Sequence, residues 1–275
     1  MASRSRRLRE LRTALHASSR DELPAGLQDV PEPVARHFAN LSGYEIAVFL
    51  RRLVPEGGRD LIVGVGTGRD WWYLGLRDEA VALDLVEQST VPDVVLADFS
   101  REIPFPDAHF DAVVLSDVLE HVFDDLTALR NCHRVLKEGG CLVLNVPYGD
   151  DIGDHHVRVY TRATVKRLLA AAGFRTVEEV ERGPLAHLDR YGPYRAFFHG
   201  VHLLRFVLTG RPGYDRSLRR LAEIDWFFGS RRIAPSRWSK RHGAYLKAVK
   251  APARDFAAVN RAWYANQGEQ QVGAG

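Results

Sequence analysis

Residues 61–70 read LIVGVGTGRD. An apolar run of the kind that forms a buried strand leads directly into three glycines, Gly64, Gly66 and Gly68. Because glycine has no Cβ, its backbone can approach a ligand closely, and a helix that follows directs its first N–H groups at the same place. In open α/β sheets that crevice, at the carboxyl ends of the strands, is where ligands bind. The stretch therefore predicts the first strand, turn and helix of such a sheet.

The pattern around this turn alternates between strands and helices. Continuous Val- and Leu-rich runs, typical of parallel strands covered on both faces, lie at 60–65, 80–85, 92–98, 110–117 and 141–147. Further strands are predicted at 175–182 and 242–252, and helices at 34–53, at 122–140 with glycines at its end, and at 161–174 with Thr161 or Thr164 as its cap. Strands alternating with helices imply right-handed βαβ units. The sequence thus predicts an α/β fold with a mostly parallel sheet.

The composition is that of an ordinary globular protein, with 275 residues of which 45% are hydrophobic and 27% charged. No run approaches the roughly 20 apolar residues of a membrane-spanning helix, and the Arg-rich first residues lack the apolar segment of a secretory signal. The two cysteines, Cys132 and Cys141, have no metal-binding spacing and are expected to be buried thiols of a cytoplasmic protein. Nothing in the sequence sets an oligomeric state.

The spacing of the glycines distinguishes between nucleotide ligands. Asp84 stands about 20 residues beyond Gly64, where a carboxylate can accept both hydroxyls of a ribose. A dinucleotide site calls for another glycine three residues after Gly66, and that position is Arg69. The run G-x-G-x-G, followed by LADFSREIPFPDAHFDAVVLSDVLEHV (96–122) and RVLKEGGCLVLNVP (134–147), resembles the class I S-adenosylmethionine-dependent methyltransferases.

The resemblance covers roughly residues 44–182 and implies a Rossmann-like fold. It implies a mostly parallel seven-stranded sheet with helices on both faces, plus a helical elaboration before the last strand. The expected divisions are an N-terminal arm and linker at 1–30, the core at 31–185, an acceptor-side elaboration at 186–242, the last core strand at 243–252, and a C-terminal helix and polar tail at 253–275.

The resemblance also implies a cofactor, S-adenosyl-L-methionine, which leaves as S-adenosyl-L-homocysteine. The glycines would wrap its methionine and ribose portions, Asp84 would hold the ribose, Asp98 and Phe99 would face the adenine, and Ser116 would lie beneath the methionine. The cofactor-binding residues expected on this basis are Gly64, Val65, Gly66, Gly68, Asp84, Leu85, Asp98, Phe99 and Ser116. Ile62 occupies the position, two before the first glycine, where most relatives carry an acid.

Two histidines are candidates for the chemistry. Transfer from a sulfonium needs little acid–base assistance beyond orientation, but a hydroxyl acceptor must lose its proton. His121 in SDVLEHV and His155 in the loop after the fifth strand are the candidate bases, and of the adjacent His155 and His156 only one is expected to face the cleft. Asp117, Glu120 and His121 resemble a metal-binding run of quinone-biosynthesis O-methyltransferases. The alternative is a local hydrogen-bonding role, and no metal is expected.

Three functions follow from these observations. The first is methyl transfer to an O or N atom of a small molecule or a sugar or glycan unit, with aromatic residues of the elaboration around the acceptor. The second is an RNA or protein methyltransferase that grips an anionic partner with basic residues, although no recognisable RNA-binding module is present. The third is a non-catalytic binding subunit. The basic residues are Arg4, Arg6, Arg7, Arg9 and Arg12, and later Arg216, Arg219, Arg220, Arg231, Arg232, Arg237, Lys240 and Arg241.

Overall fold

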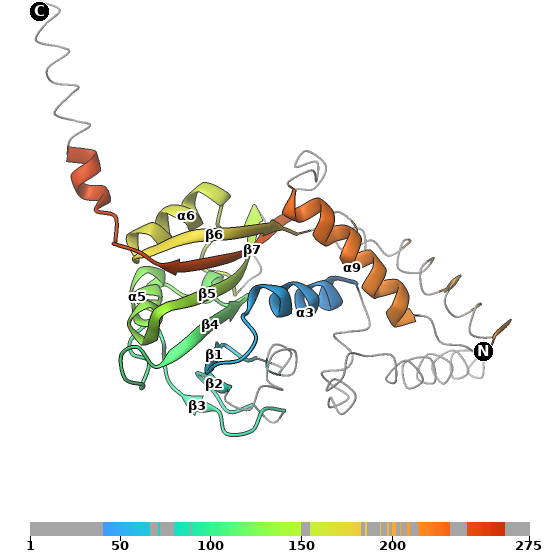
Figure 1. Cartoon of the computed structure of the whole chain (residues 1–275), viewed down its shortest axis with the longest axis horizontal. Helices are drawn as coiled ribbons and strands as arrows, with labels where there is room; N and C mark the ends of the chain where they lie inside the picture. Colours follow the sequence, from blue (N-terminus) through green and yellow to red (C-terminus); the bar gives the residue numbers. More distant parts are fainter. Residues whose placement is uncertain are drawn as a thin grey trace, which may run out of the picture.

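The computed structural model of the chain describes residues 41–66, 80–88, 90–149, 155–182, 214–231 and 241–261, together with the single residues 71, 185, 193, 197, 200, 201, 204, 208 and 209. The predicted N-terminal arm, the first part of the 34–53 helix and most of the elaboration lie outside these residues. Figure 1 shows one sheet with helices packed against it.

The sheet has seven strands in the order β3-β2-β1-β4-β5-β7-β6. All neighbouring pairs from β3 to β5 are parallel, and β7 is antiparallel to both β5 and β6. This is the mostly parallel, Rossmann-like α/β sheet that the sequence predicts. The strands are β1 (Asp60–Val63), β2 (Val81–Asp84), β3 (Val95–Leu96), β4 (Phe110–Ser116), β5 (Leu136–Gly149), β6 (Phe174–Glu181) and β7 (Arg241–Lys250).

Both faces of the sheet are buried, which explains why its strands are apolar without alternation. One face, carrying Ile62, Val114 and Val143, packs against α3 (Leu41–Leu53) and α9 (Tyr214–Ser230). The other face carries Leu61, Val113 and Leu142, each one residue earlier, and packs against α5 (Asp125–Val135) and α6 (Arg162–Ala171). Helices therefore cover both faces, as predicted (Figure 1).

The helices on the second face begin at polar caps. The Asp124 carboxylate accepts from the backbone N–H of Thr127 at the start of α5, and Thr161 and Thr164 form a reciprocal capping box at the start of α6. The prediction of one helix over 122–140 is wrong in its length. The helix ends at Val135, and 136–140 already belong to β5, where Gly139 has φ +83°. A 3₁₀ turn, η3 (Leu119–His121), precedes it.

Part of the predicted elaboration forms the helix α9, which packs against α3. Trp226 is one of the aromatic residues of the elaboration that were expected around the acceptor. It meets Phe49 of α3 edge to face with ring centroids 4.9 Å apart, and the Arg52 guanidinium lies 4.7 Å from its ring centroid. This residue therefore belongs to the contact between α3 and α9.

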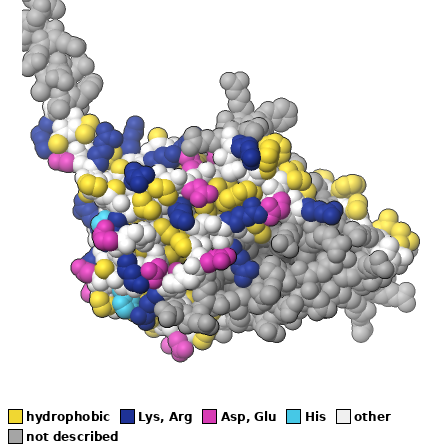
Figure 2. All heavy atoms as spheres, viewed as in Figure 1, with side chains coloured by type: hydrophobic (Ala, Val, Ile, Leu, Met, Phe, Trp, Pro, Cys, Tyr) yellow, Lys and Arg dark blue, Asp and Glu magenta, His cyan; other side chains and the backbone are white. Residues whose placement is uncertain are grey.

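The mixed charges on the surface and the burial of both cysteines are what the composition predicts. Lys, Arg, Asp and Glu side chains are interspersed on the face drawn in Figure 2. In the part of the chain that the structure describes, no helix is both long and apolar enough to cross a membrane. Cys132 and Cys141 are buried free thiols, and burial raises the pKa of Cys132 to about 12.

Candidate functional site

A cavity of about 290 Å³ opens at the carboxyl ends of the parallel strands. It is the crevice where open α/β sheets bind their ligands. The residues that line it lie at or just after the ends of β1 and β2, just after β3 and β4, and at the end of η3. They are Val63, Gly64, Gly66, Leu83, Asp84, Leu85, Ala97, Phe99, Asp117, Val118, His121 and Val122.

The glycine turn that follows β1 is shaped so that only glycine fits at its first position. Gly64 has φ +69°, and a Cβ built on it would lie 2.6 Å from a γ-carbon of Val118. Its N–H donates to the carbonyl oxygen of Leu83 at 2.8 Å, which ties the turn to β2. Gly66 also has a positive φ, +50°. At these two glycines the backbone itself faces the cavity, in space that a side chain would otherwise take up.

Asp84 at the end of β2 fixes this turn. Its carboxylate accepts from the N–H of Gly66 at 3.0 Å and from the N–H of Leu85 at 2.6 Å. Ile62, which replaces the acid expected near the first glycine, is buried in the core of the sheet. Among the described residues, the carboxylate that bonds to this turn is therefore that of Asp84, from the neighbouring strand.

The other predicted cofactor residues fall into three groups. Leu85 and Phe99 line the cavity with Gly64, Gly66 and Asp84. Val65, Asp98 and Ser116 are neighbours of lining residues without lining it themselves; the Asp98 carboxylate accepts from the N–H and hydroxyl of Ser100, and Ser116 is buried. Gly68 lies outside the described residues.

A buried polar network behind the cavity was not predicted from the sequence. Asp117 adopts φ +51° just after β4, and its carboxylate accepts from Nδ2 of Asn145 at 2.9 Å and from Nη2 of Arg182 at 3.4 Å. Arg182 also donates to Oδ1 of Asn145 at 3.2 Å. Asp117 directly follows β4, and a polar residue at that position is a signal that could have indicated it, whereas Asn145 lies within β5. The network fixes the direction of a carboxylate that lines the cavity.

The Arg182 guanidinium is held as a cation in this network. Its side chain is only 12% exposed. Burial alone would lower the pKa of this group, but the nearby Tyr245, Asp117 and Glu45 raise it above its ordinary value. Glu45 comes from α3 and Tyr245 from β7, so the network joins the helix layer to the sheet next to the cavity.

Three histidines meet at the edge of the cavity. The rings of His121 and His155 are stacked with centroids 5.1 Å apart, and His156 meets both rings at 4.8 Å. His121 lines the cavity. Only one of the adjacent His155 and His156 was expected to face the cleft; neither lines the cavity, and both contact His121 instead. These residues lie in an irregular segment, so the alternation of an extended strand does not separate them.

Comparison with known proteins identifies the domain. Residues 61–144 match the family described as a methyltransferase domain. This match includes β1, the glycine turn, Asp84 and the strands through β5, on the seven-stranded sheet described above. Residues 61–144 belong to a class I S-adenosylmethionine-dependent methyltransferase domain.

The relatives of this methyltransferase domain include two mycobacterial proteins described as probable S-adenosylmethionine-dependent methyltransferases. That of Mycobacterium tuberculosis is 33% identical over 146 residues, covering 46% of this chain and 53% of the relative. That of Mycolicibacterium smegmatis is 35% identical over 103 residues, covering 33% and 40%. The chain spans about half the length of the curated relatives it matches. A phosphoethanolamine N-methyltransferase of Haemonchus contortus shares the fold with a TM-score of 0.50 at 15% identity, covering 76% of this chain and 52% of that one.

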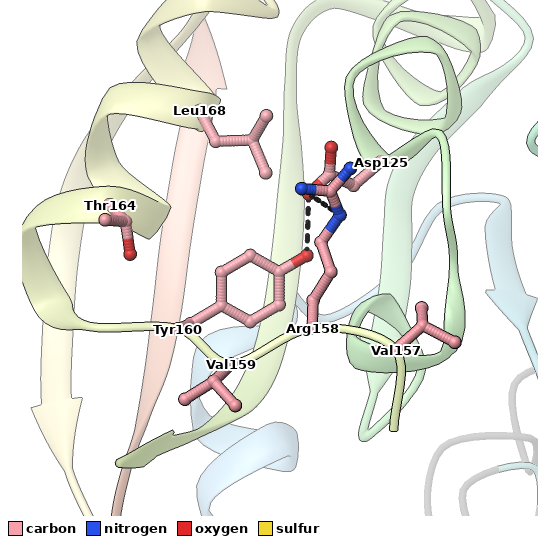
Figure 3. A pocket seen from close by; sticks show the side chains of 7 residues that line it. All are labelled: Asp125, Val157, Arg158, Val159, Tyr160, Thr164 and Leu168. Atoms are coloured by element: carbon pink, nitrogen blue, oxygen red, sulfur yellow. Dashed lines mark hydrogen bonds and ion pairs between the residues drawn. The ribbon is translucent and has the colours of Figure 1, made fainter. Parts of the chain in front are cut away.

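The segment that carries His155 and His156 is held in place by contacts around a second pocket. Arg158 and Tyr160 converge on the buried Asp125 (Figure 3), with Nε of Arg158 at 3.1 Å and the Tyr160 hydroxyl at 2.9 Å from the same carboxylate oxygen. The N–H groups of Val157 and Arg158 both donate to the carbonyl oxygen of Glu120. The segment is thereby attached to η3, which places His155 and His156 beside His121.

Proposed function

We propose that the protein is an enzyme that transfers a methyl group from S-adenosylmethionine to an O or N atom of a small molecule or a sugar or glycan unit. The observation that carries the proposal is the cavity itself. Asp84 at the end of β2 and His121 after β4 both line it, so one space contains a carboxylate suited to a ribose and an imidazole suited to an acceptor.

The residues around the cavity suit the chemistry of the cofactor. The Asp84 carboxylate can accept from two vicinal hydroxyls, and Leu85 and Phe99 offer apolar surface to an adenine. Asp117 presents a second carboxylate, and the cofactor carries positive charge on its sulfonium and its ammonium groups. When bound, S-adenosylmethionine supplies a methyl group whose leaving group is a neutral thioether.

The acceptor is assigned to the part of the chain outside the cofactor site. The methyltransferase domain accounts for cofactor binding, and the elaboration at 186–242, of which the structure describes only part, is the stretch available for the acceptor. Two basic residues of the proposed nucleic-acid contact, Arg220 and Arg231, are exposed on α9 and its end. Most of the others lie outside the described residues. We therefore keep an RNA or protein acceptor as an outcome of the test.

The proposal is tested by titration calorimetry and product analysis. We expect the purified full chain to bind S-adenosylmethionine and to release S-adenosylhomocysteine when offered a suitable member of a panel of phenols, amines and sugar hydroxyls. Steeply salt-dependent binding of RNA, with transfer to it, would replace the small acceptor with a nucleic acid. Absence of cofactor binding at millimolar concentration would contradict an enzymatic role and favour a non-catalytic binding subunit.

A first prediction concerns the histidines. We expect His121→Ala to lower kcat at saturating cofactor by at least about tenfold, because assistance to proton removal is typically worth ~10²–10⁴-fold. His155→Ala should have a smaller effect, since His155 contacts His121 but does not line the cavity. The measurement is the rate of S-adenosylhomocysteine release with the acceptor found above.

The matched control for this prediction is His109→Ala. His109 precedes β4, at the opposite edge of the sheet, where its ring stacks on Phe105 with centroids 5.6 Å apart. It should leave kcat within about twofold of the unsubstituted protein. Unchanged rates in both His121→Ala and His155→Ala would remove these histidines from the reaction while leaving cofactor binding intact.

A further inference from the structure

Three histidine side chains lie close enough together to be considered as ligands of one metal ion. Within the described residues, one ligand nitrogen from each of His121, His155 and His156 can be chosen so that all three lie within 4.8 Å of one another. Zn–N bonds of about 2.0–2.1 Å in a tetrahedral site place ligand nitrogens about 3.3 Å apart. Two of the three side chains are exposed and the third is partly so, and surface side chains of this kind can rotate toward a common ion.

The hydrogen bonding of His121 favours binding of a metal. Its Nδ1 lies 3.0 Å from the backbone carbonyl oxygen of His155. A carbonyl oxygen only accepts, so Nδ1 must carry the proton in this contact, and Nε2 is then the nitrogen that bears the free electron pair. A hydrogen bond from one ring nitrogen to a backbone carbonyl is the usual way in which a metal-bound histidine is oriented.

The backbone also limits how far the three residues can separate. The N–H groups of Val157 and Arg158 donate to the carbonyl oxygen of Glu120, the residue that precedes His121. These bonds keep the segment that carries His155 and His156 next to His121. Arg158 further donates to the carbonyl oxygen of Phe123 at 2.6 Å. The position of the segment beside His121 is therefore set by its own backbone and by Arg158, independently of any ligand.

We propose that His121, His155 and His156 form a binding site for one divalent transition-metal ion of the Zn²⁺ type. Imidazole suits Zn²⁺, Ni²⁺, Cu²⁺ and Fe²⁺ rather than Mg²⁺ or Ca²⁺, which prefer oxygen ligands. Three protein ligands leave a fourth position for water or a substrate. No metal was expected from the sequence, and the run Asp117, Glu120 and His121 is not the one assembled, since the Glu120 side chain is buried and that of His121 is exposed.

The position of the site gives the ion a role that rests on the proposed function. His121 lines the cavity, so the open position would face an acceptor at its edge. An oxygen bound to such an ion loses its proton near neutral pH. The O–H bond breaks, the oxygen keeps the electron pair, and the proton passes to solvent. Binding of the ion itself does not depend on this role.

The site is tested by titrating the untagged full chain, after chelator treatment and dialysis, with Zn²⁺ by calorimetry and with Co²⁺ by visible absorption. We expect one equivalent bound at micromolar concentration or below, with the intense absorption of tetrahedral Co²⁺. Each of His121→Ala, His155→Ala and His156→Ala should weaken binding at least about tenfold. His109→Ala should bind as the unsubstituted protein does.

The outcomes separate the metal site from the proposed function. If the protein does not bind Zn²⁺, or if all three variants bind it as the unsubstituted protein does, the proposed metal site is wrong, whatever the titration with S-adenosylmethionine gives. Binding of Zn²⁺ lost in the variants supports it even if S-adenosylmethionine does not bind, in which case the proposed function fails alone. If both bind, a kcat that falls on metal removal and returns on adding Zn²⁺ supports the catalytic role, and a kcat indifferent to Zn²⁺ contradicts that role.

Discussion

Asp84→Ala should weaken binding of S-adenosylmethionine by about 100-fold. A charged hydrogen bond contributes about 1.5–3 kcal/mol, and two ribose hydroxyls would lose their shared acceptor. The same carboxylate accepts from the N–H groups of Gly66 and Leu85, so the turn beside the ligand also loses its support. About 3 kcal/mol corresponds to about 100-fold in Kd. The measurement is a calorimetric titration of the folded variant with the cofactor.

Two further variants make this result specific. Asp84→Asn keeps one acceptor and the shape of the side chain, and we expect an intermediate loss of affinity. Glu56→Ala removes an exposed carboxylate from the loop before β1, at the opposite edge of the sheet, and should leave Kd unchanged. An affinity of Asp84→Ala within about threefold of the unsubstituted protein would contradict the assignment of the ribose to this carboxylate.

The sheet and the cavity could be predicted because their signals are local. Continuous apolar runs such as DLIV and FDAVVLS are long enough to identify buried strands, and glycines and acids follow them at the edge where parallel strands end. The departure at Ile62 raised the question of what steadies the glycine turn. The answer, the Asp84 carboxylate 3.0 Å from the N–H of Gly66, was already among the predicted residues, but in the role of a ribose ligand.

The histidine cluster could not be predicted because it depends on backbone contacts between distant residues. His121 and His155 are 34 residues apart. They meet because N–H groups of the later segment donate to the carbonyl oxygen of Glu120, and backbone groups are identical at every position of a sequence. The prediction of where α5 ends was wrong for a related reason. The glycines at 139 and 140 indicate a stop, but pairing with β4 begins at Leu136 and ends the helix earlier.

Arg182 was missed because its signal is that of a surface residue. In the sequence it ends a run rich in charged residues, RTVEEVER (175–182), a setting in which an arginine is normally solvated. Only the arrangement of β5, β6 and β7 brings Asn145, Tyr245 and Arg182 together, and α3 adds Glu45.

Arg182→Met should lower the free energy of unfolding by about 3 kcal/mol, the lower end of the ~3–5 kcal/mol that removing one member of a buried ion pair costs, because the Asp117 side chain keeps 28% of its surface exposed. Methionine fills much of the space but leaves the Asp117 carboxylate without its cation in a site where Arg182 is only 12% exposed. For a chain of this size the melting temperature should fall by roughly 10 °C. Equilibrium unfolding in urea, followed by circular dichroism, measures the change directly.

The control for this effect lies on the same strand. Arg175 of β6 is exposed, and Arg175→Met should change the free energy of unfolding by no more than about 0.5 kcal/mol. Adding Asp117→Asn to Arg182→Met removes the uncompensated charge, so the double variant should be more stable than the sum of the single changes predicts. Additive losses would mean that the two charges are solvated independently. Coupling would instead tie the carboxylate that lines the cavity to the cation that holds it, so that cofactor affinity and stability fall together in Arg182→Met.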